Sequence, residues 1–179
     1  ESYPGLKAEI LDDFDMMKAW RHDLHANPEL GFEEHRTSDL VAKMLRAWNI
    51  EVHVGVVGGP TGVVGVLKGK APSAASIMLR ADMDALPMQD DTKDGYQSRN
   101  NGVHHGCGHD GHTSMLLGAA KYLSSTRNFS GTVTFVFQPN EEATGMFQGT
   151  KVEHEMGQSG GELMTRQGLF EKFPCDQVY

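Results

Sequence analysis

Two stretches near the beginning of the chain carry apolar residues at the spacing of an amphipathic helix. In the first stretch these residues are Leu11, Phe14, Met17, Trp20 and Leu24, and in the second they are Leu40, Val41, Met44, Leu45 and Trp48. We expect Asn27-Pro28 to end the first helix, because the residue before a proline is driven out of the helical region. The pattern therefore predicts two helices, each with one buried face.

After residue 50 the apolar pattern changes to that of strands. EVHVGVV (51–57) and TGVVGVLKG (61–69) alternate or are rich in β-branched residues, and they flank the turn-forming GGP. This arrangement predicts a hairpin. ASIMLRADM (75–83) is a short apolar run that becomes acidic at its end, as expected of a buried strand that delivers side chains to a site. GTVTFVFQP (131–139) is continuously Val, Thr and Phe until its proline, and it predicts another strand.

A long polar segment and further elements complete the pattern. Residues 87–108 are polar and rich in Gly and Asn, which predicts a loop, and loops of this length in compact domains are usually functional. HTSMLLGAAKYLSS (112–125) predicts a helix that buries Met115, Leu116, Ala119, Ala120 and Leu123. A short helix is expected near 162–167 and a strand start at 176–179. Helices interleaved with apolar strands predict an α/β layered domain with a mixed sheet.

Composition and charge limit the function classes. The chain of 179 residues carries 16 Lys and Arg against 24 Asp and Glu, a net charge of −8. We therefore expect no partnership with nucleic acid or with an anionic membrane. No apolar run approaches a membrane span of about 20 residues, and the first residues lack the pattern of a secretory signal. Two cysteines in a chain of this length indicate a cytoplasmic protein rather than a disulfide framework.

The densest chemistry lies in HHGCGHDGHTSM (104–115), which holds four of the nine histidines and one of the two cysteines. Thiolate and imidazole are preferred ligands of zinc and related divalent metals, and a carboxylate completes such a set. The glycines at 106, 108 and 111 let the backbone bend so that Cys107 and His109 point the same way. His112 would lie at the helix start and orient a ligand or a carboxylate.

Carboxylates follow the two predicted strands, at Asp82 and Asp84 and at Glu141 and Glu142. Sites in open α/β sheets form beyond the carboxyl ends of the strands, so we expect these residues to converge with the histidine-rich loop. Neighbours on an extended segment point to opposite sides. One glutamate would therefore bind metal while the other faces the substrate and moves its protons.

An ordered set of motifs resembles the M20 family of metal-dependent amidohydrolases and peptidases, in its branch of hippurate and auxin-conjugate hydrolases. The motifs are RHDLHANPELGFEEHRTSDLV, IMLRADMDALPM, GCGHDGHTSMLLGAA, FVFQPNEE and GLFEKFP, from about residue 16 to the end. The resemblance implies a three-layer α/β/α fold with a mixed sheet, like that of zinc exopeptidases. It also implies hydrolysis of the amide bond of N-acyl amino acids or related amides by metal-activated water, with two divalent ions per complete site, of Zn, Mn or Ni.

The resemblance also implies roles for individual residues. Cys107, His109 and Glu142 match the family's metal ligands, and Glu141 matches its general base. Asp84 matches the aspartate that supports and orients the metal site. Asp82 stands where other branches place a metal-binding histidine, and we expect only a supporting role for it.

The resemblance covers only the first part of the family's enzymes. Residues 1–179 would be the N-terminal part of the catalytic domain, without its C-terminal part and without the lid domain that provides dimer contacts. Two further metal-binding histidines of the family are absent. Residues 143–160 would be an insertion beside the active site. The alternative is therefore a non-catalytic metal-binding fragment that needs its missing half, whereas the complete enzyme is expected to be a homo-oligomer.

Other interpretations of single residues remain open. Cys107 and His109 could belong to a structural zinc site, although such sites usually have four Cys or His ligands. Cys107 could instead be a nucleophile paired with His105 or His109, or could form a disulfide with Cys175. The remaining histidines are expected in ordinary positions, with His22 and His25 at the surface or its boundary and His104 and His154 in solvent. His105 could likewise be a solvated loop residue.

Overall fold

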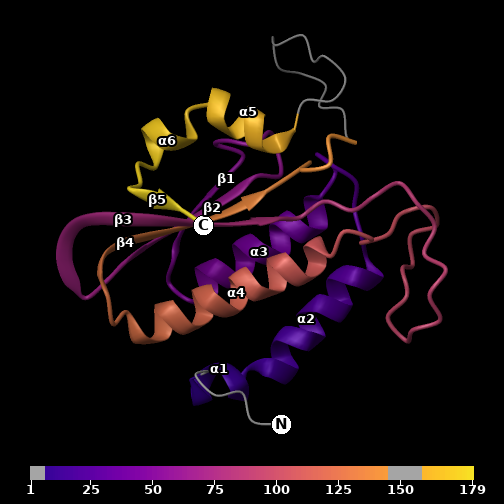
Figure 1. Ribbon diagram of the computed structural model, residues 1–179, viewed down its shortest axis with the longest axis horizontal. Coiled ribbons are helices and arrows are strands. Elements are labelled where there is room, and N and C mark those ends of the chain that lie inside the picture. The colour runs from indigo at the N-terminus through magenta and orange to yellow at the C-terminus, as the bar shows by residue number, and fades with distance from the viewer. Residues whose placement is uncertain (1–6, 145–158) are drawn as a thin grey trace.

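The computed structural model describes residues 7–144 and 159–179, in which one five-stranded sheet is covered by helices on both faces (Figure 1). The strands are β1 (Glu51–Val54), β2 (Val63–Lys68), β3 (Ala71–Asp82), β4 (Ser130–Gln138) and β5 (Gln177–Val178). The helices are α1 (Ala8–Asp12), α2 (Phe14–Ala26), α3 (His35–Ala47), α4 (His109–Thr126), α5 (Gly160–Arg166) and α6 (Leu169–Lys172).

The strand order is β1-β2-β4-β3-β5, and the sheet is mixed. The predicted hairpin is confirmed, because β1 and β2 pair antiparallel, and β2 also pairs antiparallel with β4. The neighbours β3 and β4 run parallel and are connected through α4, while β5 extends the parallel half. Parallel neighbours end at the same edge of a sheet, which decides where the functional groups of this chain meet.

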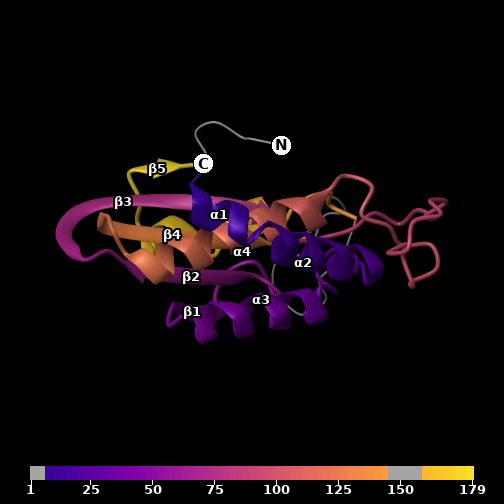
Figure 2. The same ribbon diagram turned by 90° about the horizontal axis from the view of Figure 1, so that it is seen from below.

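Two apolar clusters fill the spaces between the sheet and the helices on its two faces. The larger cluster joins α3 and α4 to one face of the sheet, with Leu45, Leu117 and Phe135 fully buried. On the opposite face, Met164 and Leu169 from α5 and α6 pack on Val136. The views in Figures 1 and 2 show this arrangement, with α2 to α4 on one side of the sheet and α5 and α6 on the other. The predicted α/β/α architecture is thus confirmed.

The first predicted helix is interrupted, and its apolar face is only partly buried. Two helices, α1 and α2, occupy this stretch and meet at Asp13, and α2 ends at Ala26, before Asn27-Pro28 as expected. Leu24 is buried, but Leu11 and Phe14 are exposed. Helical spacing therefore located the helical stretch correctly, whereas nothing in the described structure covers the beginning of its apolar face.

One core prediction is wrong. Met115, expected on the buried side of α4, is 58% exposed, although Leu116 and Ala120 are buried as predicted. Met115 lies on the flank of the helix that lines two surface pockets, one of which α4 shares with the edge of β3. The predicted insertion falls mainly at residues 145–158, outside the described part of the chain, and so does His154. Within the described ranges, no helix has the length and apolar character of a membrane span.

Candidate metal centre

The two parallel strands β3 and β4 bring the predicted carboxylates to one place. Asp82 at the end of β3 is the register partner of Gln138 at the end of β4. The residues that follow each strand therefore leave the sheet side by side. The backbone amide of Glu142 donates a hydrogen bond to Asp84 Oδ2 (3.1 Å), which links the two strand exits directly. The expected convergence at this edge of the sheet is confirmed.

His109 stands at the centre of this edge, as the first residue of α4. The helix begins three residues earlier than the sequence pattern predicted, with Gly108 before it in the left-handed conformation (φ +81°). His109 Nδ1 lies 2.9 Å from the backbone oxygen of Asp84 and 3.2 Å from its Oδ1. A carbonyl oxygen can only accept, so Nδ1 carries the proton, and Nε2 faces the carboxylates of the site.

The predicted metal-binding side chains lie together. One ligand atom each of Cys107, His109 and Glu142 lies within 4.8 Å of the other two. His109 Nε2 is 3.9 Å from Glu142 Oε1 and 3.9 Å from Glu141 Oε2, beyond hydrogen-bond length. Sulfur, nitrogen and oxygen donors at such separations suit one zinc-like divalent ion. The buried Asp84, which holds the opposite nitrogen of the imidazole, completes the arrangement typical of metal-binding histidines.

Electrostatics at the site is dominated by its carboxylates. Burial lowers the pKa of His109, but the hydrogen bond with Asp84 and the charges of Asp82 and Asp84 outweigh burial and raise it to about 9. Burial opposes the charge of Asp84, yet its hydrogen bonds with His109 and with the backbone at 141 and 142 hold its pKa below the usual value. The site therefore attracts positive charge, which a divalent cation supplies.

The environment of Cys107 disfavours a cysteine nucleophile. Its hydrogen bond with Glu142, together with desolvation and nearby negative charges, raises the pKa of this exposed thiol to about 11. An activated nucleophilic cysteine needs the opposite shift, because the thiolate is the reactive form. Both Cys107 and Cys175 are free, so the disulfide considered from the sequence does not form.

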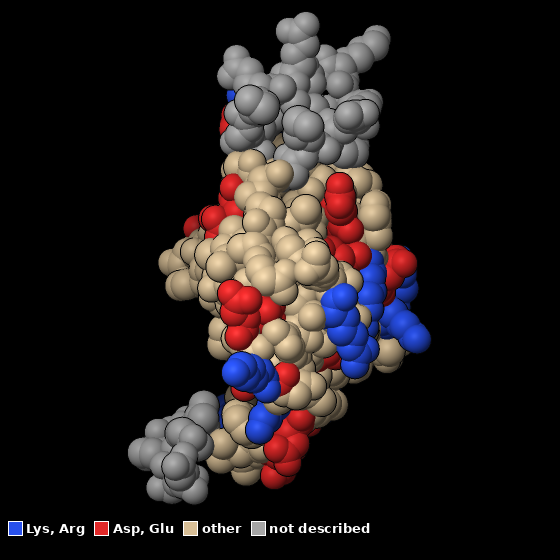
Figure 3. All heavy atoms as spheres, turned by 90° about the vertical axis from the view of Figure 1, so that its right-hand side faces the viewer, with Lys and Arg blue, Asp and Glu red and all other residues tan. Residues whose placement is uncertain are grey.

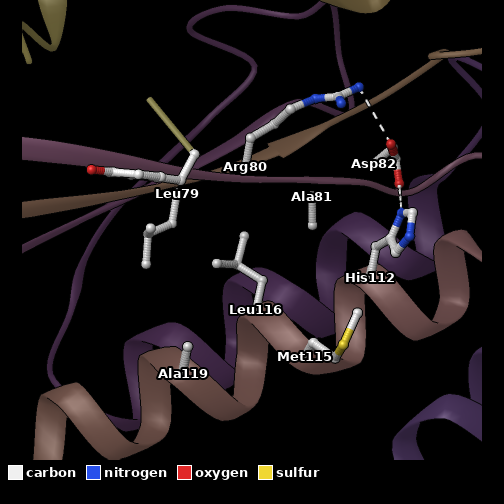
Figure 4. Close-up of a pocket in the computed structure, with 9 residues that line it drawn as sticks. Leu79, Arg80, Ala81, Asp82, His112, Met115, Leu116 and Ala119 are labelled. Atoms are coloured by element: carbon white, nitrogen blue, oxygen red, sulfur yellow. Dashed lines mark hydrogen bonds and ion pairs between the residues drawn. The ribbon is translucent and has the colours of Figure 1, made fainter. Parts of the chain in front are cut away.

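Asp82 and His112 lie beside the centre, and Figure 4 shows Asp82 between His112 and Arg80. Asp82 Oδ1 is 2.7 Å from His112 Nδ1 and 3.7 Å from His109 Nε2, while Asp82 Oδ2 lies 3.3 Å from the guanidinium of Arg80. These contacts place Asp82 between a histidine of α4 and an arginine of β3. The expectation that His112 would orient a carboxylate agrees with its hydrogen bond with Asp82.

Comparison with known proteins identifies the family. Residues 78–179 match the model of peptidase family M20/M25/M40. Over 98% of its length the chain is 48% identical to hippurate hydrolase of Campylobacter jejuni, and over 84% it is 44% identical to an IAA-amino acid hydrolase of Arabidopsis thaliana. This chain belongs to the M20/M25/M40 family.

The fold agrees with that of solved M20 proteins. The YXEP protein of Bacillus subtilis, described as a dinuclear metal-binding peptidase of the M20 family, superposes with a TM-score of 0.78 at 32% identity. The match covers 94% of this chain and 42% of that protein. The chain likewise spans 41% of the Campylobacter jejuni relative and 33% of the Arabidopsis thaliana relative.

Sequence reasoning missed one residue that supports this M20 site. Glu34 is completely buried, and its Oε1 accepts a hydrogen bond from the backbone amide of Asn140 (2.8 Å). Its Oε2 accepts another from the Thr61 hydroxyl (2.7 Å). Asn140 directly precedes the paired glutamates, so Glu34 fixes the backbone from which they extend. Glu34 belongs to the quoted motif GFEEH, but its spacing gave no indication of this partner 106 residues away.

Three histidines are less exposed than the sequence suggested. His25 is 4% exposed and His105 is 5% exposed, and the His104 side chain is 14% exposed. The expected positions of His25 and His104 are therefore wrong, and the solvated position considered for His105 is not the one it occupies. The reason is tertiary: the loop after β3 folds back over the end of α2, where His25 meets Asp110 of α4. His22, which stacks on Tyr96 of that loop, is at the boundary as expected.

The surface around the strand ends carries both signs of charge. Figure 3 views the molecule from the side at which β3 and β4 end, and acidic and basic side chains are interspersed over the described part of this face. A continuous basic field of the kind that binds a polyanion is not present on it.

Proposed function

We propose that this chain supplies the metal-binding and proton-transferring part of an amidohydrolase that cleaves N-acyl amino acids or related small amides. The observation that carries the proposal is the meeting of Cys107, His109 and Glu142 within 4.8 Å, with Glu141 beside them. The family match and the similarity to a hippurate hydrolase and an IAA-amino acid hydrolase support this substrate class.

In this proposal Cys107, His109 and Glu142 hold a divalent ion, one of two in the complete site, and Zn, Mn or Ni is the expected metal. The ion would polarise the amide carbonyl and lower the pKa of a water molecule. Asp84 keeps the proton on His109 Nδ1, so that Nε2 is the nitrogen that would give up its proton and bind the metal. Asp82 supports the same edge through His112.

Glu141 acts as the general base in this proposal. Its carboxylate is 38% exposed and lies 3.9 Å from His109 Nε2, so it borders the site and remains accessible to a substrate. It takes a proton from the attacking water as the carbon–oxygen bond forms. It then passes this proton to the amine nitrogen as the carbon–nitrogen bond breaks. The products are a carboxylic acid and a free amino acid.

Further parts of the proposal concern the whole protein. Residues 1–179 correspond to the N-terminal part of a catalytic domain, and its C-terminal part and a lid domain would complete the enzyme as a homo-oligomer in the cytoplasm. The chain spans well under half of its relatives, which favours the second candidate for the isolated chain. That candidate is a metal-binding fragment that becomes active only with its missing half.

A chimera tests both candidates. This chain replaces the matching 41% of the Campylobacter jejuni hippurate hydrolase, and release of glycine from hippurate is measured with added Zn²⁺ or Mn²⁺, beside the isolated chain. We expect activity in the chimera only. Glu141→Gln should lower kcat by about 10²- to 10⁴-fold without loss of bound metal, whereas the exposed Glu171→Gln on α6 should change neither. Unchanged kcat in Glu141→Gln would remove the assignment of the base.

A further inference from the structure

A second set of metal-ligand types lies outside the candidate metal centre and shares no residue with it. It consists of His25 at the end of α2 and of Asp90 and His104 in the loop that follows β3. One ligand atom of each lies within 4.8 Å of the other two. Asp90 is 1% exposed and His25 is 4% exposed, so the group is built into the fold rather than scattered over its surface.

The separations in this group fit ligands of one ion better than hydrogen bonds. Asp90 Oδ2 lies 3.4 Å from His104 Nδ1 and 3.7 Å from His25 Nε2. Ligand atoms about 2.0–2.2 Å from a tetrahedral zinc ion are about 3.3–3.5 Å apart. His104 Nδ1 is buried and has no hydrogen-bond partner. A buried polar atom without a partner is costly, and an ion between the three side chains would satisfy it.

The surroundings prepare the three side chains for this role. His25 Nδ1 is 2.6 Å from Asp110 Oδ2, which also lies 2.8 Å from Arg21 Nε. The carboxylate accepts from His25 Nδ1 and thereby leaves the lone pair on Nε2, the nitrogen that faces Asp90. This carboxylate–histidine contact is typical of the partners that orient metal-binding histidines.

Asp90 is held in its charged form by the loop itself. Its Oδ2 accepts a hydrogen bond from the Ser98 amide (2.8 Å) and its Oδ1 accepts one from the Thr92 amide (2.9 Å). These bonds hold the pKa of Asp90 well below its usual value. The carboxylate is therefore fixed and ionised before any cation arrives, which lowers the entropic cost of binding.

We propose that His25, Asp90 and His104 form a second divalent-metal site, which binds zinc-like ions and fastens the loop after β3 to helix α2. Two imidazoles and one carboxylate favour zinc, cobalt or nickel over magnesium or calcium, which prefer oxygen ligands. The loop continues from His104 into Cys107 and His109, so a metal ion bound at this second site would restrain the segment that carries the candidate centre. The inference does not depend on the proposed function.

A cobalt titration of the His109→Ala variant tests this site. His109 belongs to both of the other candidate ligand groups in the described residues, Cys107–His109–Glu142 and Asp82–His109–His112. Its removal disables both groups and leaves the proposed site intact. We expect His109→Ala to bind one Co²⁺ with the visible absorption of a tetrahedral site and without a thiolate-to-cobalt band, because the proposed ligands include no cysteine.

Second substitutions identify the ligands. Adding His104→Gln to His109→Ala should abolish Co²⁺ binding, and adding Asp110→Asn should weaken it by about 10- to 100-fold. The matched control adds His53→Gln, which alters a histidine paired with Glu51 on the surface strand β1 and should leave binding unchanged. Circular dichroism establishes that each variant is folded.

The outcomes separate clearly. Absence of Co²⁺ binding in folded His109→Ala, or equal binding with and without His104→Gln, would overturn the proposal. If His109→Ala does not fold, the same comparison uses the otherwise wild-type chain. In that chain, His104→Gln should remove one bound Co²⁺, while the thiolate-to-cobalt band of the Cys107 centre persists. If His104→Gln instead removes the thiolate-to-cobalt band and keeps the absorption of the cobalt site without a thiolate, the proposal is also overturned.

Discussion

At the scale of single residues, the site depends on carboxylates that each hold two partners. Asp84 faces His109 with Oδ1 and accepts the Glu142 amide with Oδ2. The buried Asp84 thus fixes the side chain of His109, a predicted metal ligand on α4, and the backbone of Glu142, a predicted metal ligand after β4. Glu34 likewise accepts from two partners, the Thr61 hydroxyl and the backbone amide of Asn140. Removing either carboxylate would leave a buried donor unsatisfied as well as loosening the site.

Glu34 predicts a pH dependence of stability. Burial outweighs its hydrogen bonds and raises its pKa from 4.5 to about 7. The folded protein then binds this proton more tightly than the unfolded chain does, so the stabilising contribution is complete below pH 4.5 and is lost as the pH rises through 7. Glu34→Gln, which stays neutral, should gain stability relative to wild type over this range, by roughly 3 kcal/mol in total.

The measurement is urea unfolding at a series of pH values between 4 and 8. The neighbouring Glu33 is exposed, and Glu33→Gln serves as the matched control for the loss of one carboxylate at the surface. If the free energy of unfolding of Glu34→Gln differs from that of wild type by the same amount at every pH, the raised pKa of Glu34 is contradicted.

At the scale of elements, the beginning of α4 positions the centre. Gly108 separates Cys107 from His109 and lies at φ +81°, where a side chain is strained although no atom lies within 4 Å of the position of an added Cβ. Gly111, one turn into the helix, has equally open surroundings and no positive φ. Neither glycine has an atom near the position of an added Cβ, so a difference between alanine substitutions at Gly108 and Gly111 reports backbone strain rather than a steric clash.

We expect Gly108→Ala to lower the free energy of unfolding by about 1–2 kcal/mol, the cost of the left-handed conformation for a residue with a Cβ. It should also weaken zinc binding, because relief of the strain would turn Cys107 and His109 apart. Gly111→Ala should be neutral or stabilise the protein by up to about 1 kcal/mol. Urea unfolding and zinc titration of both variants provide the measurement, and equal destabilisation by the two would refute the role given to Gly108.

The elements that the sequence predicted well are those with local causes. Strands β3 and β4 follow from a short apolar run and from a run of Val, Thr and Phe stopped by Pro139, and their parallel pairing explains why Asp84 and the paired glutamates meet. What escaped prediction depends on distant partners. The buried His25 is bonded to Asp110, 85 residues away, a partner that no local pattern indicates. Helical spacing alone could not show that one flank of α4, at Met115, lies uncovered.

At the scale of the whole molecule, the candidate centre joins segments that are far apart in the sequence. Cys107 comes from the long loop, His109 from α4 and Glu142 from the exit of β4. An ion bound to all three would cross-link these segments in the folded state alone. Ligand binding of this kind stabilises a protein in proportion to the logarithm of free ligand over Kd.

Zinc should therefore raise the melting temperature of this chain. At a free concentration about 100 times Kd the gain is about 2.7 kcal/mol, equivalent to roughly 5–10 °C for a domain of this size. Cys107→Ser should lose the part of this shift that comes from the candidate centre, since a hydroxyl is a far poorer zinc ligand than a thiolate, and should keep any part that comes from the site proposed at His25, Asp90 and His104. The matched control is Cys175→Ser, at the only other cysteine of the chain and outside the centre, which should keep the full shift. Differential scanning calorimetry with zinc and after chelation decides the matter, because equal shifts in the two variants would mean that the stabilising ion does not bind at Cys107.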